Sequence, residues 1–219
     1  MWIMLGRISS LSGPLSTLRT TDIVKTELVL YYDISKSSSY AGSGTTVVDL
    51  QGNSNATLTN GPAYADGYLT FDGTNDYLLT STSLASKVPT DVTSISLWAY
   101  PMDNGVLLAE LGQATIDDGW HDSQLEMVAG TMKFGMWGPA GYDGATFSST
   151  IATPLNAWYN FALVYDGTKL TGYVNGVSAG TVTFARNNPI ENSSGLYYAI
   201  AATDFTNMGD GTYANMRLG

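Results

Sequence analysis

Cysteine is absent from the 219-residue chain, and histidine occurs once, at His121. The absence of cysteine excludes disulfides, thiolate zinc sites and a cysteine nucleophile, and it leaves the redox compartment undetermined. No Gly-x-Ser-x-Gly motif accompanies the single histidine, so a Ser-His-Asp triad has little support. One histidine without cysteine also disfavours a zinc site.

Charge is scarce as well. Charged residues make up 13% of the chain, and the formal net charge is −10. Nucleic-acid binding needs clustered Lys and Arg, and anionic membranes repel an acidic protein, so we expect neither as a partner. No apolar run approaches the roughly 20 residues that cross a bilayer. The apolar start, Met1 to Leu5, is interrupted by Gly6-Arg7 and does not resemble a signal peptide. A chain of this kind that acts outside a cell would leave by another route, such as release of virus particles at lysis.

Short runs with period-two alternation fill the chain from Leu28 onward, which predicts β-strands separated by turns. No segment shows ten residues of helical periodicity. The clearest hairpin signals are Asp166-Gly167 and Asn175-Gly176 between alternating runs. We expect an all-β protein, with strands near 28–32, 68–71, 77–79, 93–100, 106–111, 124–128, 131–137, 158–165, 170–174 and 177–184.

Residues 1 to 26 differ from the rest, because they lack strand alternation and carry three of the nine basic residues. Two interpretations stay open. The segment is either a disordered leader or an arm that docks on a neighbouring subunit and buries Trp2, Ile3, Met4 and Leu5. The predicted organisation is therefore an arm or leader at 1–26 and one domain at 27–219.

Three stretches resemble the laminin-G-like, concanavalin A-like domains. They are Tyr68 to Leu78, with Asp72-Gly73-Thr74-Asn75-Asp76 at its centre, then Thr93 to Pro101, then Trp158 to Gly176 with its closing Asn-Gly. The resemblance implies a two-sheet antiparallel jelly-roll sandwich. It says less about function, because this fold carries lectins, glycosidases, adhesion modules and spacers.

The opening of the domain resembles sandwich domains in tailed-phage structural proteins. The stretches that carry this likeness are Leu28–Asp33, Ser39–Thr46, Asp49–Ala56 and Thr59–Pro62. The resemblance implies a non-enzymatic component of a virion surface or appendage, such as a capsid decoration protein, fibre or tail part. Its expected partners are other virion proteins or copies of itself, with a cell-surface glycan as a further partner. A free extracellular carbohydrate-binding module remains the alternative.

The end of the chain departs from the family pattern. The stretch Tyr213 to Gly219 resembles one that usually leads into a last, sheet-closing strand, and here the chain stops. Either the sequence is truncated, or an edge is open for a partner strand. An unpaired edge is a liability for a free monomer.

A glycosidase on this fold is the nearest enzymatic alternative. Retaining hydrolysis needs two carboxyl groups about 5 Å apart. The family pattern is a Glu, an Asp two residues on, and a Glu three further. The four glutamates, at 27, 110, 126 and 191, are too far apart in sequence to form it. A pair assembled from Asp on separate loops is left open.

Two segments are candidate binding loops. Asp117 to Asp122 gathers three carboxylates, an imidazole and an indole, while Trp137 to Gly144 places Trp and Tyr among glycines. Indole offers a flat apolar face with a hydrogen-bond donor. We interpret Trp120, His121, Asp122, Trp137 and Tyr142 as candidate carbohydrate contacts. The alternatives are a polar turn with Trp120 over the core edge, and packing of the second loop over the sandwich mouth or a neighbouring subunit.

Oxygen-rich loops also suggest a Ca²⁺ site, because hard oxygen ligands suit that ion. The candidate ligands are Asp117, Asp118, Asp204 and Asp210, although their spacing is not diagnostic and acidic turns are the alternative.

Trp98 and Trp158 lie within predicted strands and are interpreted as core or second-layer residues. Trp98 alternates with Ile95, Leu97 and Ala99 and should point to an outer sheet face.

Overall fold

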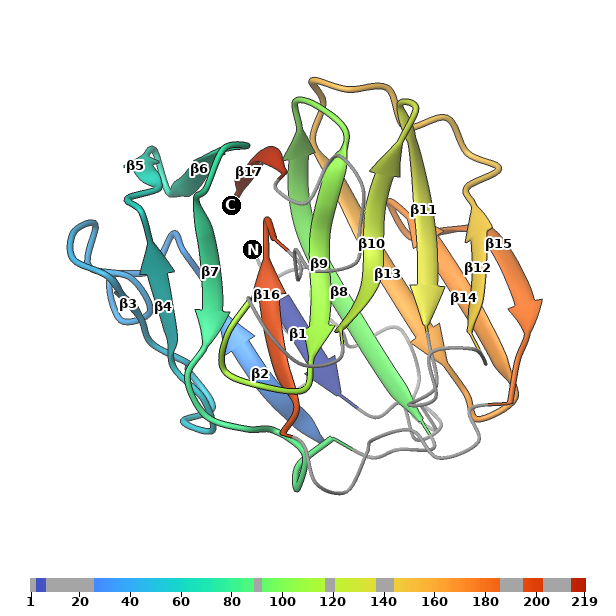
Figure 1. Ribbon diagram of the computed structural model, residues 1–219, viewed down its shortest axis with the longest axis horizontal. Coiled ribbons are helices and arrows are strands. Elements are labelled where there is room, and N and C mark those ends of the chain that lie inside the picture. The colour runs from blue at the N-terminus through green and yellow to red at the C-terminus, as the bar shows by residue number, and fades with distance from the viewer. Residues whose placement is uncertain are drawn as a thin grey trace, which may run out of the picture.

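The computed structural model describes residues 3–6, 26–88, 92–116, 121–136, 144–185, 195–202 and 214–219, with the backbone alone for 3–6, 121 and 122. In these residues the strands form two antiparallel sheets of nine and eight strands, which lie face to face as a sandwich (Figure 1). The described residues include no helix, and therefore none that could cross a bilayer. The all-β, two-sheet prediction is confirmed.

The nine-stranded sheet, called sheet A here, divides beside β8 (Thr93–Pro101). One edge of β8 pairs with β13, while the other edge is shared between β1 at Ser94–Ser96 and β17 at Ala99–Pro101. The linear order is β15 (Val177–Thr183), β14 (Lys169–Val174), β13 (Tyr159–Tyr165), β8, β17 (Asn215–Leu218), β6 (Tyr68–Asp72) and β5 (Ala63–Ala65). The second branch holds β1 (Ile3–Gly6) and β2 (Leu28–Tyr32).

The eight-stranded sheet, sheet B, has an unbranched order. Its strands are β12 (Ala145–Ser148), β11 (Thr131–Met136), β10 (His121–Val128), β9 (Gly105–Leu111), β16 (Tyr197–Ile200), β7 (Tyr77–Thr80), β4 (Ala56–Thr59) and β3 (Thr46–Val47). The edge strands β12 and β15 of the two sheets meet at one side, where the Thr150 amide donates to the Ala179 carbonyl at 2.8 Å.

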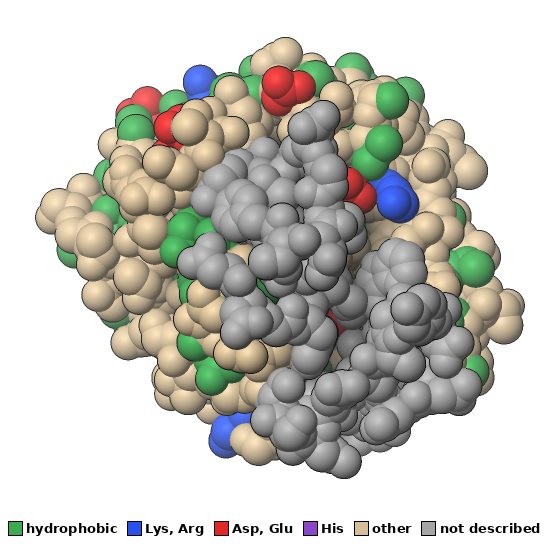
Figure 2. Space-filling view, in the orientation of Figure 1, with side chains coloured by type: hydrophobic (Ala, Val, Ile, Leu, Met, Phe, Trp, Pro, Cys, Tyr) green, Lys and Arg blue, Asp and Glu red, His purple; other side chains and the backbone are tan. Residues whose placement is uncertain are grey.

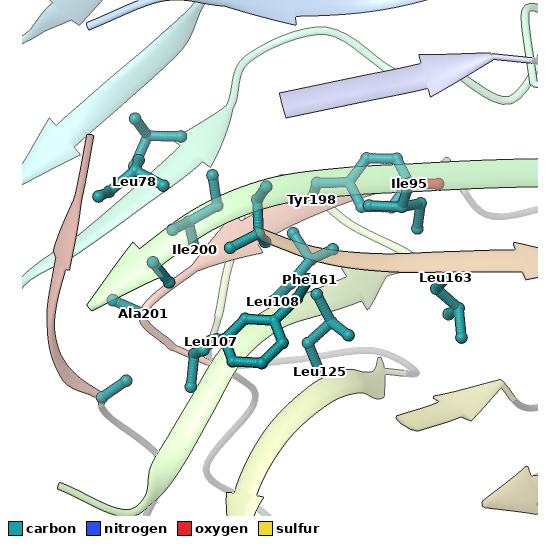
Figure 3. Close-up of a cluster of buried hydrophobic side chains, with 14 of the residues drawn as sticks. Leu78, Ile95, Leu107, Leu108, Leu125, Phe161, Leu163, Tyr198, Ile200 and Ala201 are labelled. Atoms are coloured by element: carbon teal, nitrogen blue, oxygen red, sulfur yellow. The ribbon is translucent and has the colours of Figure 1, made fainter. Parts of the chain in front are cut away.

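The main core lies between the sheets. Alternate residues of β8 and β13 are buried, and they meet buried residues of β9, β10 and β16 from sheet B. Figure 3 shows part of this cluster, with Ile95, Phe161 and Leu163 from sheet A against Leu108, Leu125, Tyr198 and Ile200 from sheet B. A residue with period-two spacing therefore faces either the core or the outside, which fixes where functional side chains can lie.

Two glycines make room for two aromatic rings inside the sandwich. Gly172 and Gly180 are opposite each other in the β14–β15 register. A Cβ on Gly172 would lie 2.6 Å from the Phe134 ring, and one on Gly180 would lie 2.9 Å from Phe147. The two phenylalanines, on neighbouring strands of sheet B, are stacked with ring centroids 5.4 Å apart. The glycines thus allow the sheets to approach closely at this end.

The predicted hairpin at Trp158 to Val177 is confirmed, and its turns use the residues that marked it. Asn175 and Gly176 both have positive φ, as a two-residue turn between twisted strands requires. At the preceding turn, Asp166 Oδ1 accepts bonds from the Thr168 and Lys169 amides at 2.9 and 2.8 Å. These bonds hold the pKa of Asp166 below its usual value.

Of the two alternatives for the end of the chain, an edge left open at this strand is contradicted. β17 lies inside sheet A and pairs with β6 on one side and β8 on the other. Its alternate residues Met216 and Leu218 are buried in the main core. The stretch Tyr213 to Gly219 was predicted to lead into a last strand that closes the sheet. Its residues Asn215–Leu218 instead form β17, which joins β6 to β8.

The N-terminal segment contains a strand that alternation did not reveal. Ile3–Gly6 forms β1, which pairs with β2 and with β8 of the same chain. Three of the four proposed arm residues, Ile3, Met4 and Leu5, lie in this strand, and Trp2 lies outside the described residues. Docking of this segment on a neighbouring subunit, and the domain boundary at residue 26, remain predictions.

The last two residues of the predicted loop at Asp117–Asp122, His121 and Asp122, belong to strand β10. β10 begins at His121 because this residue pairs with Leu111 of β9, and Asp122 pairs with Glu110.

β6 and β7, which flank the Asp72–Asp76 turn, lie in opposite sheets and do not form a hairpin. The chain crosses between the layers at this turn, where a Cβ on Gly73 would lie 2.8 Å from Asn215.

A buried carboxylate organises the corner beside β2. Asp49 accepts four backbone N–H bonds, from Tyr31, Gln51, Asn53 and Ser54, at 2.7 to 3.1 Å. The Leu50 amide donates to the Tyr31 carbonyl at 2.8 Å. The loop thereby satisfies backbone groups on the outer edge of β2, which would otherwise be an exposed strand edge.

Candidate functional site

The residues predicted to bind sugar or calcium are not placed by the structure. Trp120, Trp137, Tyr142, Asp117, Asp118, Asp204 and Asp210 lie outside the described residues, and only the backbone of His121 and Asp122 is described. The predicted roles of these nine residues therefore stay predictions. Within the described ranges, no three His, Cys, Asp or Glu side chains gather closely enough to hold a metal ion.

A cluster of aromatic side chains lies on the outer face of sheet A. Tyr68 of β6, Tyr100 of β8 and Trp158, just before β13, all alternate with core residues and point away from the core. The Trp158 ring lies edge-on to both tyrosines, at centroid distances of 6.0 Å to Tyr68 and 5.6 Å to Tyr100. Trp158 nevertheless is 37% exposed and counts among the exposed large hydrophobic residues.

Arg217 lies between the two tyrosines. It is the outward residue of β17 that is opposite Tyr100 in one neighbouring strand and opposite Thr70 in the other. Its guanidinium carbon is 5.2 Å from the centre of the Tyr68 ring and 5.1 Å from that of Tyr100. We call Tyr68, Tyr100, Trp158 and Arg217 the Arg217 cluster.

The guanidinium has no counter-charge among the described residues. Its Nε is buried and has no hydrogen-bond partner, while its terminal nitrogens are not buried and bond to no described residue. Asp72, an acidic residue on the same face of β6, instead accepts bonds from the amides of its own turn at Thr74 and Asn75. Those bonds hold the pKa of Asp72 below its usual value. Arg217 is thus held by rings and not by an acid.

The energy gained by Arg217 over the two rings can be compared with the cost of its unpaired, buried Nε. A guanidinium over an aromatic ring gains roughly 0.5–2 kcal/mol. A buried polar atom without a partner costs about 1–3 kcal/mol. The two effects are similar in size, so stabilisation of the sheet does not by itself account for an arginine here. The cluster offers a flat aromatic surface with an available cation, which suits an anionic ligand with an apolar ring face.

Sequence reasoning missed this cluster. Trp158 was interpreted as a core or second-layer residue, and it is instead partly exposed on the outer face. The prediction for Trp98 is confirmed in its direction, since it alternates with the buried Ile95, Leu97 and Ala99. Alternation of Tyr68, Tyr100 and Arg217 was the available signal, but their mutual proximity depends on the pairing of β17 between β6 and β8.

A buried glutamate of sheet B accepts hydrogen bonds from two neighbouring side chains. Glu110 of β9 is 1% exposed. Its Oε2 accepts from Gln124 Nε2 at 2.8 Å, and its Oε1 accepts from the Tyr198 hydroxyl at 3.2 Å. These two partners are an amide and a phenol, and Glu110 has a further interaction besides them.

The face over sheet B differs from the aromatic face of sheet A. In Figure 2 its described surface is mostly backbone and side chains that are neither hydrophobic nor charged, with hydrophobic and charged side chains scattered among them. A small apolar cluster of Val106, Ala109, Leu111, Ile116, Ala199 and Ala202 lies in this sheet, separate from the main core. The Arg217 cluster is therefore the site that the described residues define.

Comparisons with known proteins agree with this architecture. A model of the concanavalin A-like lectin/glucanases superfamily, of the laminin G type, matches residues 72–218. A search of curated protein sequences found no match.

Solved structures similar to this chain include binding domains. Domains LG4–5 of the mouse laminin alpha1 chain give a TM-score of 0.55 at 16% identity, covering 73% of this chain and 42% of that one. The binding domain of Paraclostridial Mosquitocidal Protein 1 gives 0.55 at 16%, covering 78% and 44%. Botulinum neurotoxin type C, whose cell entry depends on interaction with two ganglioside molecules, gives 0.56 at 10%, covering 83% and 47%.

This chain spans less than half the length of those three structures. At such identities the likeness concerns the fold alone, whereas the family match extends over most of the chain. The sandwich of β-sheets and this match together lead to one conclusion: the chain belongs to the concanavalin A-like lectin/glucanases superfamily.

Proposed function

We propose that this protein is a non-enzymatic attachment module of a virion surface or appendage, and that it contacts glycans through the Arg217 cluster. Its fold is that of lectin-like binding domains, and similar solved structures are mostly binding domains. The proposal of a non-enzymatic role is supported by the similar solved structures, several of which are binding domains.

The observation that carries the glycan proposal is the exposure of Trp158 beside Tyr68 and Tyr100. An indole presents a flat apolar surface that matches the apolar face of a pyranose ring, and it loses little conformational freedom on binding. The neighbouring tyrosines hold the indole edge-on, so its orientation is established before a ligand arrives. A pre-oriented platform reduces the entropy cost of binding.

The virion role is supported by the resemblance of residues 28–62 to domains of tailed-phage structural proteins. A particle that displays many copies also compensates for a weak site. Single lectin sites often bind at about 1 mM, near −4 kcal/mol. Linking sites on one particle raises the effective affinity by roughly 10² to 10⁴. Display on a particle and glycan binding are therefore compatible.

The alternative is a free extracellular carbohydrate-binding module with the same site. The two differ in what else the protein binds. A virion component should copurify with particles and be released by denaturation, whereas a free module should remain in the particle-free fraction. Immunodetection across a density gradient of lysate separates them.

The glycan proposal is tested by retention of the protein on beads that carry defined glycans. We expect Trp158→Ala to abolish retention while its thermal unfolding remains cooperative. Tyr173→Ala is the matched control, because Tyr173 is a half-buried aromatic residue that alternates with core positions on β14 of the same sheet. Trp120→Ala and Trp137→Ala test the loops predicted from sequence. Retention unchanged in Trp158→Ala, or lost equally in Tyr173→Ala, would contradict the assignment of this site.

A further inference from the structure

The chemistry of the Arg217 cluster specifies the class of sugar more narrowly than its aromatic rings do. Stacking on Trp158 would accept neutral and charged pyranoses alike, because it uses only the apolar ring face. Arg217 adds a fixed positive charge whose terminal nitrogens are not buried and bond to no described residue. We propose that the Arg217 cluster selects sugars that carry a carboxylate. This inference rests on the proposed glycan-binding function.

The first support is the position of the guanidinium. It lies 5.2 and 5.1 Å from the ring centres of Tyr68 and Tyr100, and Trp158 also contacts both rings. A cation held in this way keeps its donors in one geometry before binding. The planar fork of arginine matches a carboxylate, with two parallel N–H donors for two oxygens.

The second support is charge complementarity. The chain carries 19 acidic and 9 basic residues, so acidic groups that could pair with its cations are plentiful. The described Lys36 and Lys133 are each paired with an acid, at 2.9 Å to Asp33 and 3.5 Å to Glu126. Lys87, Lys169 and Arg217 are in no ion pair with the described residues, and of these three Arg217 alone lies over aromatic rings. An anionic ligand group would supply the missing charge and would meet the donors without displacing an acidic residue.

The third support is the space beside the arginine. Gly219 is two residues after Arg217, on the same face, and its position allows Trp158 and Tyr68 to close over the strand. A Cβ there would lie 2.8 Å from both Trp158 Cη2 and Tyr68 Cβ. The glycine therefore lets the indole pack against Tyr68, the same ring over which the guanidinium lies.

The carboxylated sugar could come from a sialylated glycan or from a uronic acid polymer, and the experiment distinguishes them. The probes are sialyllactose and trigalacturonate, each compared with its methyl ester, which keeps the ring and loses the charge. Affinities are measured by NMR titration of the intact protein. We expect the acid of one pair to bind about tenfold more tightly than its ester, as a hydrogen bond to a charged group warrants, and the pair that does so identifies the source.

Variants assign the preference to Arg217. We expect Arg217→Gln to bind acid and ester equally, at about the affinity that the unchanged protein has for the ester. Arg217→Lys keeps the charge without the fork and should retain part of the preference. Lys133→Gln removes the same unit of charge from sheet B and should change nothing. Raising the salt concentration should weaken binding of the acid more than binding of the ester.

Each outcome bears on a different claim. If neither acids nor esters bind, the proposed glycan-binding function fails and this inference fails with it. If acid and ester bind the unchanged protein equally, the inference is overturned while glycan binding stands. A preference that persists in Arg217→Gln also overturns it. Should Arg217→Gln fail to fold, the comparison of acid with ester on the unchanged protein and the Arg217→Lys variant still decide.

Discussion

Gly219 lies against Trp158 so closely that a methyl group at position 219 would come within 2.8 Å of the indole Cη2 atom. The contact joins the residue after β17 to the residue before β13, which are neighbours across β8. It connects the backbone of sheet A to the one exposed indole among the described tryptophans.

Gly219→Ala should therefore displace Trp158 and disturb the cluster without removing any of its four side chains. We expect glycan retention to fall nearly as far as in Trp158→Ala, with a loss of stability of about 1–2 kcal/mol from overpacking. Bead retention and urea unfolding measure the two effects. Full retention in Gly219→Ala would show that the position of Trp158 is not critical.

Gly172→Ala should destabilise the sandwich from within. A Cβ at this position meets the Phe134 ring at 2.6 Å, and the stacked Phe147 limits the movement of that ring. We expect a loss of about 2–3 kcal/mol in the free energy of unfolding, measured by urea denaturation. Adding Phe134→Leu should recover part of this loss if the clash is with the ring. Equal costs in both backgrounds would place the strain elsewhere.

β1 should contribute to stability through its backbone. Leu5 is paired with Leu30 of β2 and with Ile95 of β8, so this strand joins β2 to the rest of sheet A. Leu5→Pro removes a backbone donor and should lower the free energy of unfolding by about 3 kcal/mol. Leu5→Ala keeps the donor and serves as control.

The same argument affects truncation. Deleting residues 1–26 removes β1 as well as any assembly arm, so light scattering of the truncated protein must be read together with its unfolding curve. Cooperative unfolding at an unchanged midpoint in Leu5→Pro would mean that β1 does not stabilise the fold, and truncation would then test assembly alone.

Acid should destabilise the corner at Asp33. Burial raises the pKa of this carboxyl, but hydrogen bonds from Ser35 and Lys36 outweigh it and hold the pKa below its usual value. A depressed pKa in the folded state gives stability that is present above the unfolded pKa of about 3.9 and is lost as pH falls through the folded pKa.

Asp33→Asn should therefore be less stable than the unchanged protein at pH 7, and the difference should shrink below about pH 4. Urea unfolding from pH 3 to 7 measures this, with Asp103→Asn as the charge-matched exposed control. A difference that is constant over this range would show that lost packing, and not ionisation, accounts for the effect.

Local patterns sufficed to identify the class of fold. Alternation in Thr93–Tyr100 correctly separated core-facing from outward residues, including the direction of Trp98. Asn175-Gly176 marked a turn because positive φ is favoured by those residue types whatever surrounds them. Strand alternation and turn chemistry depend on neighbours within a few positions, so the sequence by itself determines them.

Tertiary structure alone decided which strands meet. Residues 3–6 show no alternation, yet they complete sheet A between β2 and β8, and β17 lies inside that sheet instead of at an edge. Tyr68, Tyr100, Trp158 and Arg217 come from four distant stretches and become neighbours only because of this pairing order. Pairing between distant strands is set by burial and register summed over the whole sandwich, and no local pattern records that sum.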